Sequence, residues 1–64
     1  MNDWQERVAK EKSDLDIKIH SLYVYLEKGQ PDYIGNDEWR RMCAQYEVMR
    51  MYSNLLGERI ANFM

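Results

Sequence analysis

Three polar side chains in the second half of the chain, Gln45, Tyr52 and Arg59, recur every seven residues. A seven-residue repeat places them in one column along a single edge of a helix. Arginine binds phosphate through paired hydrogen bonds, and the face of a tyrosine ring can stack on a base or a cation. Glutamine can both donate to and accept from the edge of a base. The column therefore has the chemistry to bind an anionic ligand that carries an aromatic base.

A comparable polar border lies in the first half, beside the apolar positions Val8, Leu15 and Leu22. This border consists of Arg7, Glu11, Lys18 and Tyr25, which supply further cations for phosphate and an acid that can contact a base edge. Trp4, near the start of the chain, offers another ring for stacking on a base. The predicted ligand-binding set is Trp4, Arg7, Glu11, Lys18, Gln45, Tyr52 and Arg59. The same residues also suit a simpler role, because flanking polar residues often form interhelical salt bridges that set the register of packed helices. Both interpretations remain open from the sequence.

Catalytic and metal-binding patterns are missing from the sequence. It contains no glycine-rich phosphate loop, no HExxH and no CxxC, and its single histidine, His20, has no nucleophile nearby. Cys43 is the only cysteine, which makes a poor metal site and excludes an internal disulfide. We therefore expect no enzyme activity, no catalytic residue, no metal and no cofactor.

Two apolar rows in the second half predict a helix that packs on opposite sides. The first row is continuous at spacings of three and four and consists of Trp39, Met42, Tyr46, Met49, Ser53, Leu56, Ile60 and Phe63. The second row, on the opposite side, consists of Ala44, Val48, Met51 and Leu55. One partner helix cannot cover both rows, so the pattern predicts self-association.

The first half predicts a helix with one main apolar row, from Trp4 through Val8 and Leu15 to Leu26, interrupted by Glu11 and Lys12. Asn2 or Asp3 can cap its start, Gly29 and Pro31 end it, and Asn36 or Asp37 can cap the second helix. Gly57 interrupts the second helix, where it either permits a close helix approach or bends the last turn. We expect one domain over residues 1–64, with a helix at about 3–28, a loop at 29–35 and a helix at about 37–63. The fold class predicted is all-α: an antiparallel two-helix hairpin that assembles into a homo-oligomeric helical bundle.

Size and charge set limits on the partners. A chain of 64 residues buries only about 60% of its unfolded surface, and oligomerisation is the remaining way to add stability. The net charge of −2 argues against general nucleic-acid binding. The N-terminal residues are polar and charged, and no apolar run approaches the ~20 residues of a membrane span. A cytoplasmic protein without membrane contact is expected.

Two segments, WQERVAKEKSDLDIKIHSLYVYL and QYEVMRMYSNLLGERIANF, resemble a widespread group of short phage proteins, often tied to crAss-like phages. In this chain the shared pattern reads ERV-x2-E-K-x2-L-D-x-K-I-x2-L, followed after a variable loop by Q-x3-M-x2-Y-x2-L-x3-R-I. In this chain the pattern includes Glu6, Arg7, Val8, Glu11, Lys12, Leu15, Asp16, Lys18, Ile19, Leu22, Gln45, Met49, Tyr52, Leu55, Gly57, Glu58, Arg59 and Ile60.

The chain is similar in size and in its two-sided helix to small phage proteins that act as nucleotide sponges against bacterial defences such as CBASS and Thoeris. This resemblance implies an oligomer in the cytoplasm of an infected bacterial cell that sequesters a cyclic nucleotide, or a related signalling nucleotide, without cleaving it. No sponge motif aligns with this sequence, so the binding set above comes from position alone. The competing hypotheses are a helical inhibitor or adaptor that binds a host protein, and an accessory protein of the virion.

Overall fold

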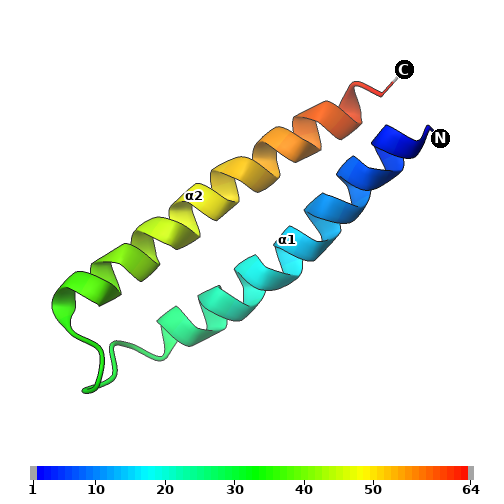
Figure 1. The fold of residues 1–64 in the computed structure, drawn as a ribbon. Coiled ribbons are helices and arrows are strands. Elements are labelled where there is room, and N and C mark those ends of the chain that lie inside the picture. Colours follow the sequence, from blue (N-terminus) through cyan, green and yellow to red (C-terminus); the bar gives the residue numbers. More distant parts are fainter. Residues whose placement is uncertain (1, 64) are drawn as a thin grey trace.

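The chain forms two long helices that lie side by side in opposite directions (Figure 1). The computed structural model describes residues 2–63, in which α1 spans Asp3–Glu27 and α2 spans Asn36–Ala61. This part of the chain contains no strand and measures 48 × 15 × 14 Å. The predicted all-α antiparallel hairpin is therefore confirmed. Its two ends meet at one tip and the loop forms the other (Figure 1).

Local hydrogen bonds explain where α1 begins and ends. At its start, the backbone amide of Asn2 donates to Oε1 of Gln5 over 3.1 Å, and the Glu6 amide donates to the Asn2 carbonyl over 3.0 Å. At its end, Gly29 has a φ of +88°, and its amide donates to the Leu26 carbonyl over 3.1 Å. This left-handed conformation is easily adopted only by glycine, so Gly29 ends the helix as predicted.

The prediction that Asn36 or Asp37 caps α2 is wrong. Gly35 is the capping residue, and its carbonyl accepts the first helical hydrogen bond from the Trp39 amide over 2.9 Å. The Asn36 side chain is engaged elsewhere, because its Oδ1 accepts a hydrogen bond from Gln30 Nε2 over 2.9 Å. Asn36 is consequently the first residue of the helix.

The core is a narrow stripe between the helices. The row from Trp39 to Phe63 is buried or half-buried, as predicted, and Val8 is the buried residue of α1. Within the described residues, only Val8, Ser53 and Leu56 are buried. Such a thin core makes a weak contribution to stability, because apolar burial supplies only about 25 cal/mol per Å².

A polar layer crosses the core where the apolar row of α1 is interrupted. Nζ of Lys12 donates to Oγ of Ser53 and to Oδ2 of Asp16, each over 2.9 Å. The Ser53 hydroxyl in turn donates to Oδ1 of Asp16 over 2.5 Å. Because these three groups satisfy one another, Ser53 can be only 6% exposed without cost from an unpaired hydroxyl.

Gly57 provides the space for this layer. A Cβ atom at position 57 would lie 3.3 Å from Cε of Lys12, which is tighter than ordinary van der Waals contact. The side chain of Lys12 therefore passes across α2 at the one residue that has no side chain. The close contact at Gly57 is with the Lys12 side chain and not with the backbone of α1, and α2 continues past Gly57 to Ala61.

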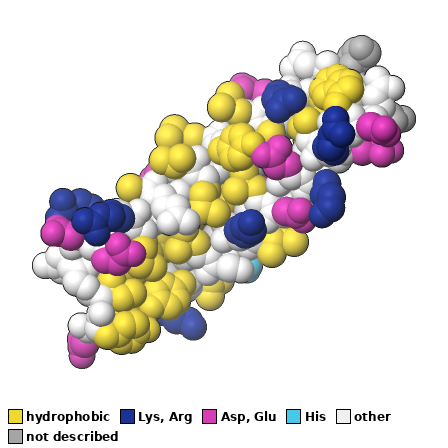
Figure 2. Space-filling view, viewed as in Figure 1, with side chains coloured by type: hydrophobic (Ala, Val, Ile, Leu, Met, Phe, Trp, Pro, Cys, Tyr) yellow, Lys and Arg dark blue, Asp and Glu magenta, His cyan; other side chains and the backbone are white. Residues whose placement is uncertain are grey.

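Much apolar surface remains uncovered. Val48, Met51 and Leu55 of the second row on α2 are 59%, 58% and 57% exposed, and Ile17 and Val24 are exposed on α1. Hydrophobic side chains spread over the face of the molecule in Figure 2. The accessible surface of 5087 Å² exceeds the roughly 4,400 Å² expected for a compact monomer of 7.8 kDa.

Candidate functional site

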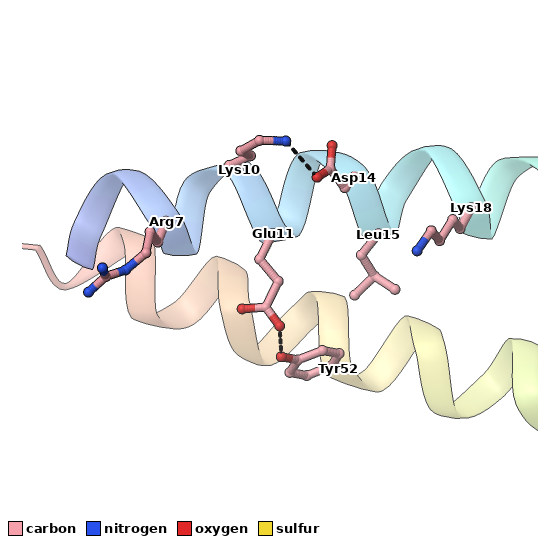
Figure 3. A pocket seen from close by; sticks show the side chains of 7 residues that line it. All are labelled: Arg7, Lys10, Glu11, Asp14, Leu15, Lys18 and Tyr52. Atoms are coloured by element: carbon pink, nitrogen blue, oxygen red, sulfur yellow. Dashed lines mark hydrogen bonds and ion pairs between the residues drawn. The ribbon is translucent and has the colours of Figure 1, made fainter. Parts of the chain in front are cut away.

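One face of the hairpin carries a groove that is lined by residues from both predicted polar borders. This groove, which we call the Tyr52 groove, has a volume of about 440 Å³. It is lined by Arg7, Lys10, Glu11, Asp14, Leu15, Lys18 and Tyr52 (Figure 3). The border of α1 and the edge of α2 thus lie on the same side of the molecule. The structure places four of the seven predicted residues, Arg7, Glu11, Lys18 and Tyr52, around one cavity.

Two residues that line the Tyr52 groove form a hydrogen bond between the helices. The Tyr52 hydroxyl donates to Oε2 of Glu11, and Figure 3 shows the two side chains meeting across the gap. This hydrogen bond, together with the nearby Glu11 charge, raises the pKa of the Tyr52 hydroxyl above its usual value, whereas Arg59 acts in the opposite direction. The phenol therefore stays a neutral donor at physiological pH, and Tyr52 is 42% exposed.

The cations around the groove differ in how they are paired. Lys10, which also lines the groove, forms an ion pair with Asp14 over 2.9 Å, and Figure 3 shows this pair farther from α2 than Glu11. Arg7 and Lys18 form no ion pair within residues 2–63. Two cations without a carboxylate partner therefore lie at the groove, where an anionic ligand would meet them.

A second groove continues from Tyr52 toward the tip where the chain ends meet. Its volume is about 500 Å³, and it is lined by Tyr52, Leu55, Leu56, Glu58, Arg59 and Asn62. Arg59, a fifth predicted residue, lies here, and it too has no ion-pair partner in the described part of the chain. Since Tyr52 lines both grooves, the two grooves meet at this residue.

The other two predicted residues lie outside these grooves. The Trp4 ring packs edge-to-face on Phe63, with 5.1 Å between centroids, at the tip where the chain ends meet. Gln45 is exposed, and its Nε2 contacts Sδ of Met49 over 3.8 Å. A single hairpin therefore does not bring Trp4 or Gln45 to the cavity beside Tyr52.

Sequence reasoning did not include three residues that line the Tyr52 groove: Lys10, Asp14 and Leu15. Lys10 and Asp14 follow Arg7 at spacings of three and seven, which places them on the same side of α1. From this spacing, the sequence could have predicted that Lys10 and Asp14 lie beside Arg7. Leu15 belongs to the apolar row, and only the packing shows that its edge reaches the groove.

The geometry contains no metal site or membrane-spanning segment in the part described. No group of three or more His, Cys, Asp or Glu side chains among residues 2–63 is arranged to hold a metal ion. Within the same range, neither helix has the length and apolar character needed to cross a bilayer. The features that contain predicted binding residues or exposed apolar rows are the two grooves at Tyr52 and the outer surface of α2.

Comparison with protein families matches residues 2–62 to the Sequestin family. The chain belongs to the Sequestin family. The match covers both helices and every residue that lines the two grooves. The family name indicates a protein that sequesters a ligand, in agreement with the predicted sponge. Comparisons with curated proteins and with solved structures found no match.

Proposed function

We propose that this member of the Sequestin family is a phage counter-defence protein, which oligomerises and sequesters a cyclic nucleotide or a related signalling nucleotide without cleaving it. It would act in the cytoplasm of an infected bacterial cell. The family assignment supports sequestration, and the chemistry of the grooves supports the nucleotide.

The observation that carries the proposal is the set of cations around the exposed ring of Tyr52. Arg7, Lys18 and Arg59 have no carboxylate partner in the described residues, and they flank Tyr52 from two sides. In this arrangement the cations bind phosphates and the ring stacks on a base. Glu11, already beside the ring, is placed to accept a hydrogen bond from a base edge.

The proposal requires no chemical step by the protein. Sequestration needs only that affinity be tight relative to the signal concentration and that binding sites outnumber signal molecules. A groove of about 440 Å³ falls in the range of small-ligand sites. We therefore propose that the ligand leaves unchanged when the protein unfolds.

A thermal-stability screen tests this proposal. Purified protein is incubated with cyclic dinucleotides, cyclic trinucleotides and cyclic ADP-ribose isomers, and the melting temperature is followed. A ligand at ~100 times its Kd stabilises the folded state by about 2.7 kcal/mol, so binding appears as a higher melting temperature. Heating must then release the intact ligand. No shift with any compound removes the proposal, and recovery of a cleaved product overturns the non-catalytic part.

Substitutions at the groove provide the site-specific test. Arg7→Gln, Lys18→Gln and Arg59→Gln should each weaken binding of the stabilising nucleotide about 3- to 10-fold, because each removes a charge-assisted contact. Arg40→Gln is the matched control, since Arg40 already pairs with Asp37 over 2.6 Å away from the grooves. Equal losses in all four variants would show that net charge, and not the site, controls binding.

The tyrosine is tested separately from the cations. Tyr52→Phe keeps the ring and loses only the hydroxyl, whereas Tyr52→Ala loses the ring. If Tyr52 stacks on a base, the alanine variant should lose about 5-fold or more in affinity, since stacking on an aromatic side chain contributes about 1–3 kcal/mol. The phenylalanine variant should stay within a few-fold of wild type. Similar losses in both variants would assign the role to the hydroxyl.

The second candidate function is a helical inhibitor or adaptor that docks on a host protein. The exposed row of Val48, Met51 and Leu55 is the observation that favours it, because such a row fits a hydrophobic groove on a partner. Light scattering separates the candidates. A chain that stays monomeric and binds none of the nucleotides would favour the inhibitor.

A further inference from the structure

The exposed apolar row of α2 belongs to a longer repeat that includes charges. Arg41, Ala44, Val48, Met51, Leu55 and Glu58 follow one another at spacings of three, four, three, four and three. All six are exposed in the hairpin. This is the a/d pattern of a coiled-coil seam, with one cation before its apolar part and one anion after it. The row spans 18 residues, or about 27 Å of helix.

We propose that a second copy of this chain covers the row, with α2 of one copy packed antiparallel on α2 of the other. The two-fold axis then passes between positions 49 and 50, midway along the row. Val48 of each copy lies opposite Met51 of the other, and Ala44 lies opposite Leu55. The small side chain thus faces the larger one, as interdigitated layers require.

The charges select the antiparallel direction. In that arrangement Arg41 lies opposite Glu58 of the second copy at both ends of the seam. A parallel pair would instead oppose Arg41 to Arg41 and Glu58 to Glu58, which is repulsive. Within its own helix Arg41 pairs with Glu38 over 3.2 Å, but that pair is largely exposed and so contributes little. Arg41 can therefore exchange Glu38 for Glu58 of the second copy across the seam.

The uncovered area also agrees with a two-fold interface. The hairpin exposes about 700 Å² more than a compact monomer of its mass. A standard interface buries about 800 Å² on each partner. Covering the row would therefore bring the exposed surface close to that of an ordinary folded protein.

The same register brings Gln45 to the binding groove. Gln45 and Tyr52 lie seven residues apart on one edge of α2, about 10.5 Å along the axis. In the antiparallel pair, Gln45 of one copy lies on the flank of the seam opposite Tyr52 of the other. The second copy would then supply the amide that a single hairpin lacks beside Tyr52. This last step rests on the proposed function, whereas the interface does not.

Charge reversal across the seam tests the direction. The wild-type mass in light scattering should be that of an even number of chains. Arg41→Glu and Glu58→Arg should each raise the dissociation constant of the α2 pair at least 10-fold, because each creates two like-charge contacts. The double variant R41E/E58R should return to within about 3-fold of wild type. Arg40→Glu, off the row, is the control and should change association little.

Cysteine pairing gives an independent readout in a Cys43→Ala background. A disulfide needs Cα atoms within about 7 Å. In the antiparallel pair, Ala44→Cys and Leu55→Cys proteins should cross-link when mixed and should not cross-link alone. Self-linking by the Ala44→Cys protein overturns the direction. A wild-type monomer, an odd number of chains, or single reversals without effect overturn the interface. None of these measurements uses a nucleotide, so failure of the interface leaves the nucleotide-binding part of the proposed function to its own test.

Discussion

Replacement of Gly57 by alanine measures how tightly Lys12 is held between the helices. Alanine in a helix interior is favoured over glycine by about 0.8–1 kcal/mol. The new Cβ would lie 3.3 Å from Cε of Lys12, so the lysine must move. Its movement weakens the 2.9 Å bonds to Ser53 and Asp16, at a cost of about 1 kcal/mol. Gly57→Ala in wild type should therefore change the free energy of unfolding by close to zero.

The same substitution in a Lys12→Ala background should behave differently. Without the lysine, the Cβ meets no side chain, and the full gain of about 1 kcal/mol should appear. Ser53 keeps Asp16 as its acceptor in that background, so its buried hydroxyl stays paired. Lys10→Ala is the matched control, because Lys10 pairs with Asp14 farther from α2 than Glu11.

The assay is urea denaturation followed by far-ultraviolet circular dichroism, with all variants at one protein concentration because association would affect the midpoint. The coupling between Gly57→Ala and Lys12→Ala should be about 1 kcal/mol, and that with Lys10→Ala should be near zero. Independent sites add within about 0.3–0.5 kcal/mol. A Gly57→Ala effect that is equal in all three backgrounds would refute the packing of Lys12 over Gly57.

Two further predictions concern acid stability and the helix end. The hydrogen bond from Ser53, and then that from Lys12, hold the pKa of Asp16 below its ordinary value of 3.8. The stability that comes from a lowered folded-state pKa is fully present above the ordinary value of 3.8. It is lost as the pH falls through the folded-state pKa. The stability difference between wild type and Ser53→Ala should thus shrink in acid, and a difference that does not depend on pH would contradict this cause. Gly29→Ala should lower the free energy of unfolding by about 1–2 kcal/mol, because the φ of Gly29 is positive. Gly35 has a φ of −73°, so Gly35→Ala should lower it much less. Equal urea midpoints for the two variants would contradict this expectation.

The helices and their contact stripes could be predicted from local patterns. The row from Trp39 to Phe63 repeats at helical spacing without a break, and Gly29 and Pro31 interrupt any helix. These signals depend on residues close together in the sequence, so no knowledge of the packing is needed. The capping of α2 was the exception, because Gln30 engages the Asn36 side chain from across the loop.

The candidate site was only partly accessible in this way. The polar types of Arg7, Glu11, Lys18 and Tyr52 were recognisable, but no local pattern states that the border of α1 and the edge of α2 lie on one side. The rotation of each helix about its axis and the register between them decide that. The Tyr52–Glu11 bond joins residues 41 positions apart, and it exists only in the packed hairpin.

The sequence by itself determined two amphipathic helices, the break between them and an apolar surplus on α2, because periodicity and chain breakers act within a few residues. Only the tertiary structure decided that Lys12 crosses at Gly57 to reach Ser53, and that Arg7 and Lys18 share a groove with Tyr52. The physical reason is that a side chain's partners across an interface depend on helix rotation and register. Many residues set those quantities together, and no single motif encodes them.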